Sequence, residues 1–164
     1  MKEKWTLHII TAVVFVVFII LGLACASNPG SFTVSGSADL SKYNYATISN
    51  VMDYRGSPEL MDLEVKIYDA LSVTRLTLIG DKEIDTLSED QKQELLLVRF
   101  SAEQKASPEL ANYRSYVTIN FVEYISGKPV ASCHGDSSGK LTSSTQADME
   151  VAFNKVLAQV KKIF

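Results

Sequence analysis

The residues best suited to chemistry lie late in the chain, where Cys133 and His134 precede the tripeptide Gly135-Asp136-Ser137. A serine nucleophile needs a separate base within hydrogen-bond reach, and a reactive thiol needs a cationic, accessible setting. Of the 2 histidines, His8 lies in an N-terminal apolar run, so only His134 could serve as that base. Cys133 and His134 are adjacent, and on a strand they point to opposite faces. We therefore predict a polar turn leaving a hairpin at this tripeptide, a buried and inert Cys133, and a protein that is not an enzyme.

Metal and cofactor motifs are also weak. Asp81, Glu83 and Asp85 alternate and could gather carboxylates around calcium, but no glycine or bidentate glutamate follows at EF-hand spacing. The chain has too few cysteines and histidines for a zinc ribbon or finger. No glycine-rich turn between a strand and a helix matches a phosphate-binding loop. The sequence therefore predicts no metal site and no cofactor.

Cys25 is the residue whose surroundings predict a specific modification. No Asp, Glu, Lys or Arg occurs between positions 5 and 38, and Ile9–Leu23 is almost wholly apolar after a short basic start. That arrangement is typical of a secretory signal. The run ends in Leu21-Gly22-Leu23-Ala24-Cys25, which resembles a lipobox, with Gly22 where leucine is usual. In bacteria this signal directs attachment of diacylglycerol to the cysteine sulfur and cleavage before it.

The lipobox resemblance implies the organisation of the N-terminal region. Residues 1–24 are expected to be a lipoprotein signal peptide, and residues 25–38 the lipid anchor and a flexible tether. Cleavage removes 24 of the 164 residues and leaves 140. The implied location is the bacterial cell envelope, at the outer membrane facing the periplasm, with lipid on Cys25 as the membrane contact. An uncleaved membrane helix and simple secretion remain as alternatives, since about 20 apolar residues span a bilayer.

Composition bounds the rest of the chain. Hydrophobic residues make up 46% and charged residues 21%, which is ordinary for a globular protein. The net charge of −3 gives no basic footprint for nucleic acid. Residues 39–164 have the length of a single domain, which we expect to be an α/β sandwich.

Hydrophobic periodicity predicts the elements of this domain. Leu60, Leu63, Ile67 and Leu71 form a helical stripe, and a second stripe runs from Met149 to Phe164. A capping box at Ser88 predicts a short extra helix. Strands are expected over residues 43–51, 74–80, 95–104, 113–125 and 130–136, followed by a loop to residue 144. This β-α-β-β-β-β-α order predicts an α+β fold, a mainly antiparallel sheet of about five strands with both long helices on one face.

Helices on one face leave the other face of the sheet uncovered. Alternation places aromatic and polar residues together on the expected strands, and such surfaces suit recognition. We predict a partner-binding surface at the following positions: Tyr43, Tyr45, Tyr116, Thr118 and Tyr124. The alternative is that these tyrosines fill a second side of the core.

The domain resembles small α/β domains of bacterial envelope lipoproteins, including accessory lipoproteins of envelope transport and curli-type assembly. The features that carry the resemblance are the Cys25 anchor, Asp39–Tyr43 before a strand, Leu76–Gly80 after a helix and the Val122–Ser132 hairpin. The resemblance implies a non-catalytic accessory subunit that binds an envelope protein. A lipid- or glycan-binding accessory component is the alternative, and it requires a concave apolar pocket between sheet and helices. A hydrolase is a third hypothesis, which a single usable histidine does not favour.

Overall fold

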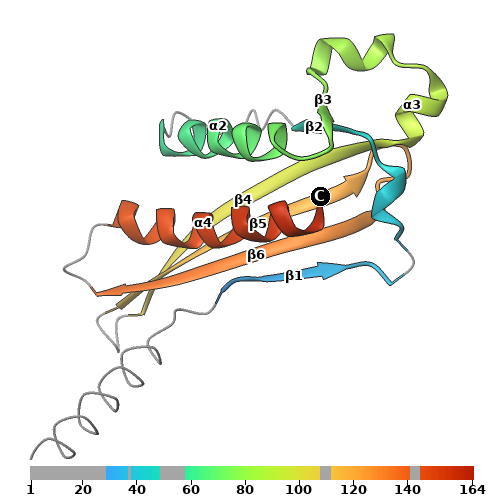
Figure 1. Ribbon diagram of the computed structural model, residues 1–164. Coiled ribbons are helices and arrows are strands. Elements are labelled where there is room, and N and C mark those ends of the chain that lie inside the picture. Colours follow the sequence, from blue (N-terminus) through green and yellow to red (C-terminus); the bar gives the residue numbers. More distant parts are fainter. Residues whose placement is uncertain (1–28, 37, 49–57, 108–111, 141–144) are drawn as a thin grey trace, which may run out of the picture.

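A computed structural model describes residues 29–36, 38–48, 58–107, 112–140 and 145–164 (Figure 1). The predicted signal peptide and Cys25 lie outside these ranges. Within them the elements are, in chain order, β1 (Ser31–Val34), η1 (Leu40–Lys42), β2 (Tyr45–Ile48), α2 (Pro58–Ser72), β3 (Thr77–Leu78), η3 (Asp81–Thr86), α3 (Glu89–Gln93), β4 (Leu95–Ser107), β5 (Asn112–Glu123), β6 (Pro129–Lys140) and α4 (Thr145–Ile163).

The strands of the described residues form a six-stranded sheet in the order β1-β6-β5-β4-β2-β3. The long strands β4, β5 and β6 pair antiparallel, and β1 adds antiparallel to β6. β2 runs parallel to both β4 and β3, so the sheet is mixed. One bulge interrupts the β5–β6 register between Phe121 and Val122. The prediction of an α+β fold is confirmed.

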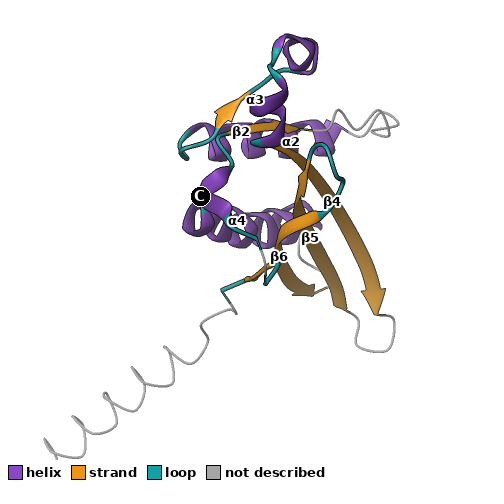
Figure 2. Ribbon diagram, turned by 90° about the vertical axis from the view of Figure 1, so that its right-hand side faces the viewer, coloured by secondary structure: helices purple, strands orange, loops and turns teal. Residues whose placement is uncertain are grey.

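Both long helices pack on one face of the sheet (Figures 1 and 2). Apolar residues spaced by one helical turn bring α2 and α4 onto the inward residues of the long strands. The largest fully buried members of this core include Ile67 and Leu71 from α2, Phe153, Val156 and Val160 from α4, and Val98, Val117, Ile119 and Phe121 from the sheet. Alternation over residues 95–104 predicts that Leu96, Val98, Phe100 and Ala102 face inward, and all four belong to the core or pack against it. The sequence leaves the inward face of residues 113–125 open, and the structure shows that it is the face of Val117, Ile119 and Phe121.

Helix α4 approaches β6 most closely at Gly135. A Cβ built there would lie 2.2 Å from the carbonyl oxygen of Ala152 and 2.8 Å from a methyl of Val156. Next to this contact, the Lys155 ammonium donates to the carbonyl oxygen of Asp136 at 2.7 Å. The glycine therefore lets the helix backbone rest directly on the strand.

The structure settles or corrects three sequence-based expectations. Alternation of Phe32 and Val34 within the expected tether left a short edge strand open, and residues 31–34 do form strand β1, because their backbone pairs with residues 131–134 of β6. The loop expected after residue 136 continues instead as β6 to Lys140, since each residue there pairs with β5. The acidic stretch 81–86 is a 3-10 helix, in which the Glu83 carboxylate accepts from the Gly80 amide at 3.1 Å.

Candidate functional site: the open face of the sheet

The sheet face away from α2 and α4 carries polar and charged side chains at its centre. Residues directly opposite each other on paired strands share a face, so the register of β4, β5 and β6 assigns its members. They alternate with the core residues Val98, Val117 and Cys133. We call this surface the open face and define it by Arg99, Ser101, Glu103 and Lys105 of β4, Arg114, Tyr116, Thr118 and Asn120 of β5, and Ser132, His134, Asp136 and Ser138 of β6.

Tyr116, Thr118 and His134 form the centre of the open face. Thr118 lies opposite His134 across the β5–β6 pair, and its hydroxyl is 3.1 Å from His134 Nδ1. The rings of Tyr116 and His134 stack at 6.1 Å with an interplanar angle of 29°. The Lys105 ammonium lies 5.7 Å from the Tyr116 ring centroid, within cation–π range. These contacts hold two half-buried rings in fixed positions with hydrogen-bonding groups beside them.

Charged side chains of both signs border this centre. Arg99, Glu103, Lys105 and Arg114 are all exposed. Glu103 and Lys105 are 3.1 Å apart, but both side chains are more than half exposed, so their ion pair adds little stability. A surface with central aromatic groups and a charged, solvated border matches the anatomy of a protein-binding interface.

The five residues predicted as a partner surface do not form one surface. Tyr116 and Thr118 lie together at the centre of the open face. Tyr43 belongs to the core, where it is 2% exposed and its hydroxyl donates to Glu123 at 3.3 Å, so its assignment to a surface was wrong. The physical reason is that β2 begins only at Tyr45, so the alternation does not extend back to Tyr43.

The other two predicted residues lie away from the centre. The Tyr45 hydroxyl accepts a hydrogen bond from Gln91 of α3 at 3.2 Å, which covers that end of the sheet. Tyr124 is 37% exposed and follows the end of β5.

Sequence reasoning missed His134 as a surface residue. Only the pairing of Thr118 with His134 reveals its role, and that register is not written in the periodicity of either strand.

The arrangement on β6 separates the groups that nucleophilic catalysis would need. Cys133 is fully buried among core side chains, and this burial raises the pKa of its thiol to about 12. Ser137 is 8% exposed and lies on the helix side of the strand, opposite buried Ser115, whereas His134 lies on the open face. His134 therefore cannot act as a base for either Cys133 or Ser137.

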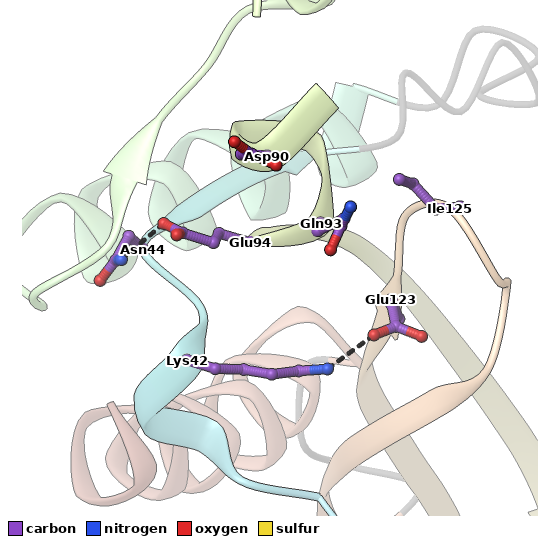
Figure 3. Close-up of a pocket in the computed structure, with 7 residues that line it drawn as sticks. All are labelled: Lys42, Asn44, Asp90, Gln93, Glu94, Glu123 and Ile125. Carbon is purple, nitrogen blue, oxygen red and sulfur yellow. Dashed lines mark hydrogen bonds and ion pairs between the residues drawn. The ribbon is translucent and has the colours of Figure 1, made fainter. Parts of the chain in front are cut away.

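A polar hollow of about 710 Å³ lies at the end of the sheet where η1, α3 and the β5–β6 turn meet (Figure 3). Lys42 and Glu123 form an ion pair at 2.7 Å across it, and Asn44 donates to Glu94 at 2.7 Å. Hydrogen bonds from Lys42 and Ser126 hold the pKa of Glu123 below its usual value. Four of the polar groups that line the hollow are thus paired with one another. Over the described ranges, no cluster of three or more His, Cys, Asp or Glu could hold a metal ion.

A second hollow of about 570 Å³ lies between α2 and the β2–β3 edge. Its floor is apolar at Ala46, Ile48 and Leu78, and its rim carries acidic groups at Glu64, Asp81 and Glu83. The concave site required by the small-ligand alternative has its nearest counterpart here.

Among the described helices, none is long and apolar enough to span a membrane.

Comparison with known proteins shows the fold. No protein-family model matches the sequence, and no curated protein matches it. The PelC dodecamer from Paraburkholderia phytofirmans is similar in structure, with a TM-score of 0.51 and 13% identity over 80% of this chain and 99% of that chain. A PDZ domain protein from Parabacteroides distasonis has a TM-score of 0.57 and 13% identity, over 82% of this chain but 34% of that longer chain. At such low identity the likeness concerns the architecture.

Proposed function

We propose that this protein is a non-catalytic accessory protein of the bacterial cell envelope, held to the membrane by lipid on Cys25, that binds a protein partner through its open face. The observation that carries the proposal is the Tyr116–Thr118–His134 centre on a sheet face that the helices leave uncovered. Aromatic groups ringed by solvated charges are the groups that contribute most to protein–protein affinity. The envelope location rests on the apolar run that ends at Cys25.

The non-catalytic role is supported by the geometry of β6. His134 lies on the opposite face of the sheet from Cys133 and Ser137, so neither of these two side chains forms a nucleophile–base pair with it. The structural similarity to the PelC dodecamer adds one specific form that the partner can take, a second copy of the chain. The experiment below distinguishes a second copy from a different protein by mass.

The proposal is tested by placing a photo-crosslinking amino acid at Thr118 in the full chain, in its native membrane. Tyr68 on the outer side of α2 is the matched control, because it is 53% exposed and lies far from the open face. We expect one adduct of defined mass from position 118 and none from position 68. An adduct of twice the chain mass identifies a second copy, and any other defined mass identifies a different protein. Equal or absent crosslinking at both positions contradicts the proposal.

Substitutions separate binding from folding. Tyr116→Ala removes a half-buried ring outside the core and should abolish the adduct while lowering the unfolding midpoint far less than a core substitution does. Tyr43→Ala removes a buried ring and should cost about 3–5 kcal/mol of stability. If Tyr116→Ala lowers the midpoint as much as Tyr43→Ala does, the open face is part of the core and the proposed function fails.

A further inference from the structure

The folded domain begins immediately after the expected lipid anchor. The carbonyl oxygen of Pro29 accepts a hydrogen bond from the side-chain amide of Gln159, which is 3% exposed in α4. Gly30 follows with φ of +61° and lies against the backbone of His134 and the Cβ of Lys155. Strand β1 then pairs with β6 along its whole length. The chain is therefore fixed to the body of the domain from Pro29 onward.

This attachment leaves very little chain between anchor and domain. Cys25 and Pro29 are four residues apart, and four residues span at most about 14 Å even when fully extended. If Cys25 is lipidated, as the proposed function states, the edge of the domain formed by β1 and α4 must lie within that distance of the membrane surface. The domain cannot stand clear of the bilayer on a long tether.

The edge nearest the anchor exposes apolar side chains. Phe32 lies opposite Cys133 and therefore shares the sheet face that the helices cover. β1 is one strand further out than β6, beyond α4, so the Phe32 side chain is 46% exposed. α4 runs alongside β1 (Figure 1), and its residues four apart share one side. Val151, which is 44% exposed, is aligned on that side with Lys155. Two large apolar side chains thus reach solvent along this edge.

The same edge is cationic. Lys155, Gln159 and Lys162 follow one another along the side of α4 that meets the start of β1. No Asp or Glu occurs between Val151 and Phe164, whereas the whole chain has a net charge of −3. We define the anchor rim as Phe32 of β1 with Val151, Lys155 and Lys162 of α4.

We propose that the anchor rim rests on an anionic phospholipid surface, with Phe32 and Val151 at the level of the headgroups and the lysines beside the phosphates. Amphipathic surfaces that combine an exposed aromatic residue with lysines bind at this boundary. β1 and β3 are opposite edges of the sheet, so the sheet then stands edge-on to the membrane. The open face remains accessible to a protein partner beside the bilayer.

The test measures how well each edge is shielded from water. The full chain is placed in vesicles of phosphatidylglycerol and phosphatidylcholine, with a fluorophore on Phe32→Cys or, as the control, on Val65→Cys. Val65 is 60% exposed on α2, and five strand spacings, about 24 Å, separate the two sheet edges. Cys133 stays unlabelled because it is buried. Wild-type protein carried through the same labelling supplies the background from Cys25.

We expect aqueous iodide to quench the Phe32→Cys label several-fold less than the Val65→Cys label. Lys162→Gln should weaken the membrane contact of the anchor rim by about fivefold. Lys82→Gln, at an exposed lysine of η3, is the matched control and should leave that contact unchanged. Vesicles of phosphatidylcholine alone should reduce the protection of the Phe32→Cys label.

The outcomes separate this proposal from the proposed function. Equal quenching at the two sites in anionic vesicles, with lipid found on Cys25 by mass, overturns the anchor rim alone. Protection at position 32 with an intact, unlipidated N-terminus supports the rim and replaces the lipid by the apolar run as anchor. A protein that does not float with the vesicles overturns both.

Discussion

Replacing Gly135 with alanine tests the most specific contact in the fold. The new Cβ would lie 2.2 Å from the carbonyl oxygen of Ala152, and Cβ atoms essentially never lie closer than 3.0 Å to such a neighbour. The obstacle is helix backbone, which cannot rotate away as a flexible side chain can. α4 must therefore move by roughly 0.8 Å or more, which separates Val156 from its packing partners. Such overpacking typically costs 1–3 kcal/mol, and a backbone obstacle places Gly135→Ala at about 3 kcal/mol.

A smaller, opposite effect must be subtracted. Glycine to alanine restricts the unfolded chain and contributes about 0.4–1 kcal/mol of stability. The net loss is then about 2–3 kcal/mol, and for a domain of this size the thermal midpoint should fall by about 10 °C. Gly36→Ala is the matched control, because no atom lies within 4 Å of its added Cβ. It should unfold at or slightly above the wild-type midpoint.

The assay is thermal unfolding of the full-length protein in mild detergent, followed by circular dichroism. Wild type, Gly135→Ala and Gly36→Ala are compared in the same detergent, so the contribution of the N-terminal region cancels. An unchanged thermal midpoint for Gly135→Ala would refute the direct contact between the α4 backbone and β6 at Gly135. It would also remove the basis for placing Lys155 at the anchor rim.

Three further results are expected. Burial raises the pKa of the Cys133 thiol to about 12, so the thiol should not react with a disulfide reagent at pH 8 until urea unfolds the protein. Equal reaction rates in the folded and the unfolded protein would contradict the burial of Cys133. Gln159→Ala should lower the free energy of unfolding by about 1–2 kcal/mol and speed amide hydrogen exchange in β1, since it removes the hydrogen bond to the Pro29 carbonyl. Unchanged exchange in β1 would rule out that hydrogen bond. Glu123→Gln should cost less than about 1 kcal/mol at pH 7. Folding lowers the pKa of Glu123, so the carboxylate stabilises the fold at pH values above its pKa in the unfolded chain. This stabilisation is lost as the pH falls through the pKa of Glu123 in the folded protein. At that low pH, urea titrations of the wild type and of Glu123→Gln should give the same free energy of unfolding.

The helices and most strands could be predicted because their signals are local. α2 and α4 each bury one stripe at helical spacing, and that stripe is visible in any window of the sequence. Strands β4 and β5 alternate between core and solvent, and both alternations agree with the structure. The capping box at Ser88 likewise marks the start of α3, where Ser88 and Gln91 bond reciprocally.

The errors arose where long-range pairing decides the outcome. Residues 137–140 have serine- and glycine-rich neighbours and weak local preference for a strand, but they pair with residues 112–115 of β5. Tyr43 has the β-propensity of a strand residue, yet it precedes β2 and packs in the core. Local propensity cannot report which neighbour a strand will find.

The sequence by itself determined the types of the main elements, the α+β class and the inward face of β4, because these follow from periodicities of 3.6 and 2 residues. Only the tertiary structure decided that Thr118 meets His134, that β1 fixes the chain at Pro29 and that Gly135 seats α4. Each of these depends on strand register and order. Register is set by the packing of the whole sheet against its helices, and no single segment of the chain contains that information.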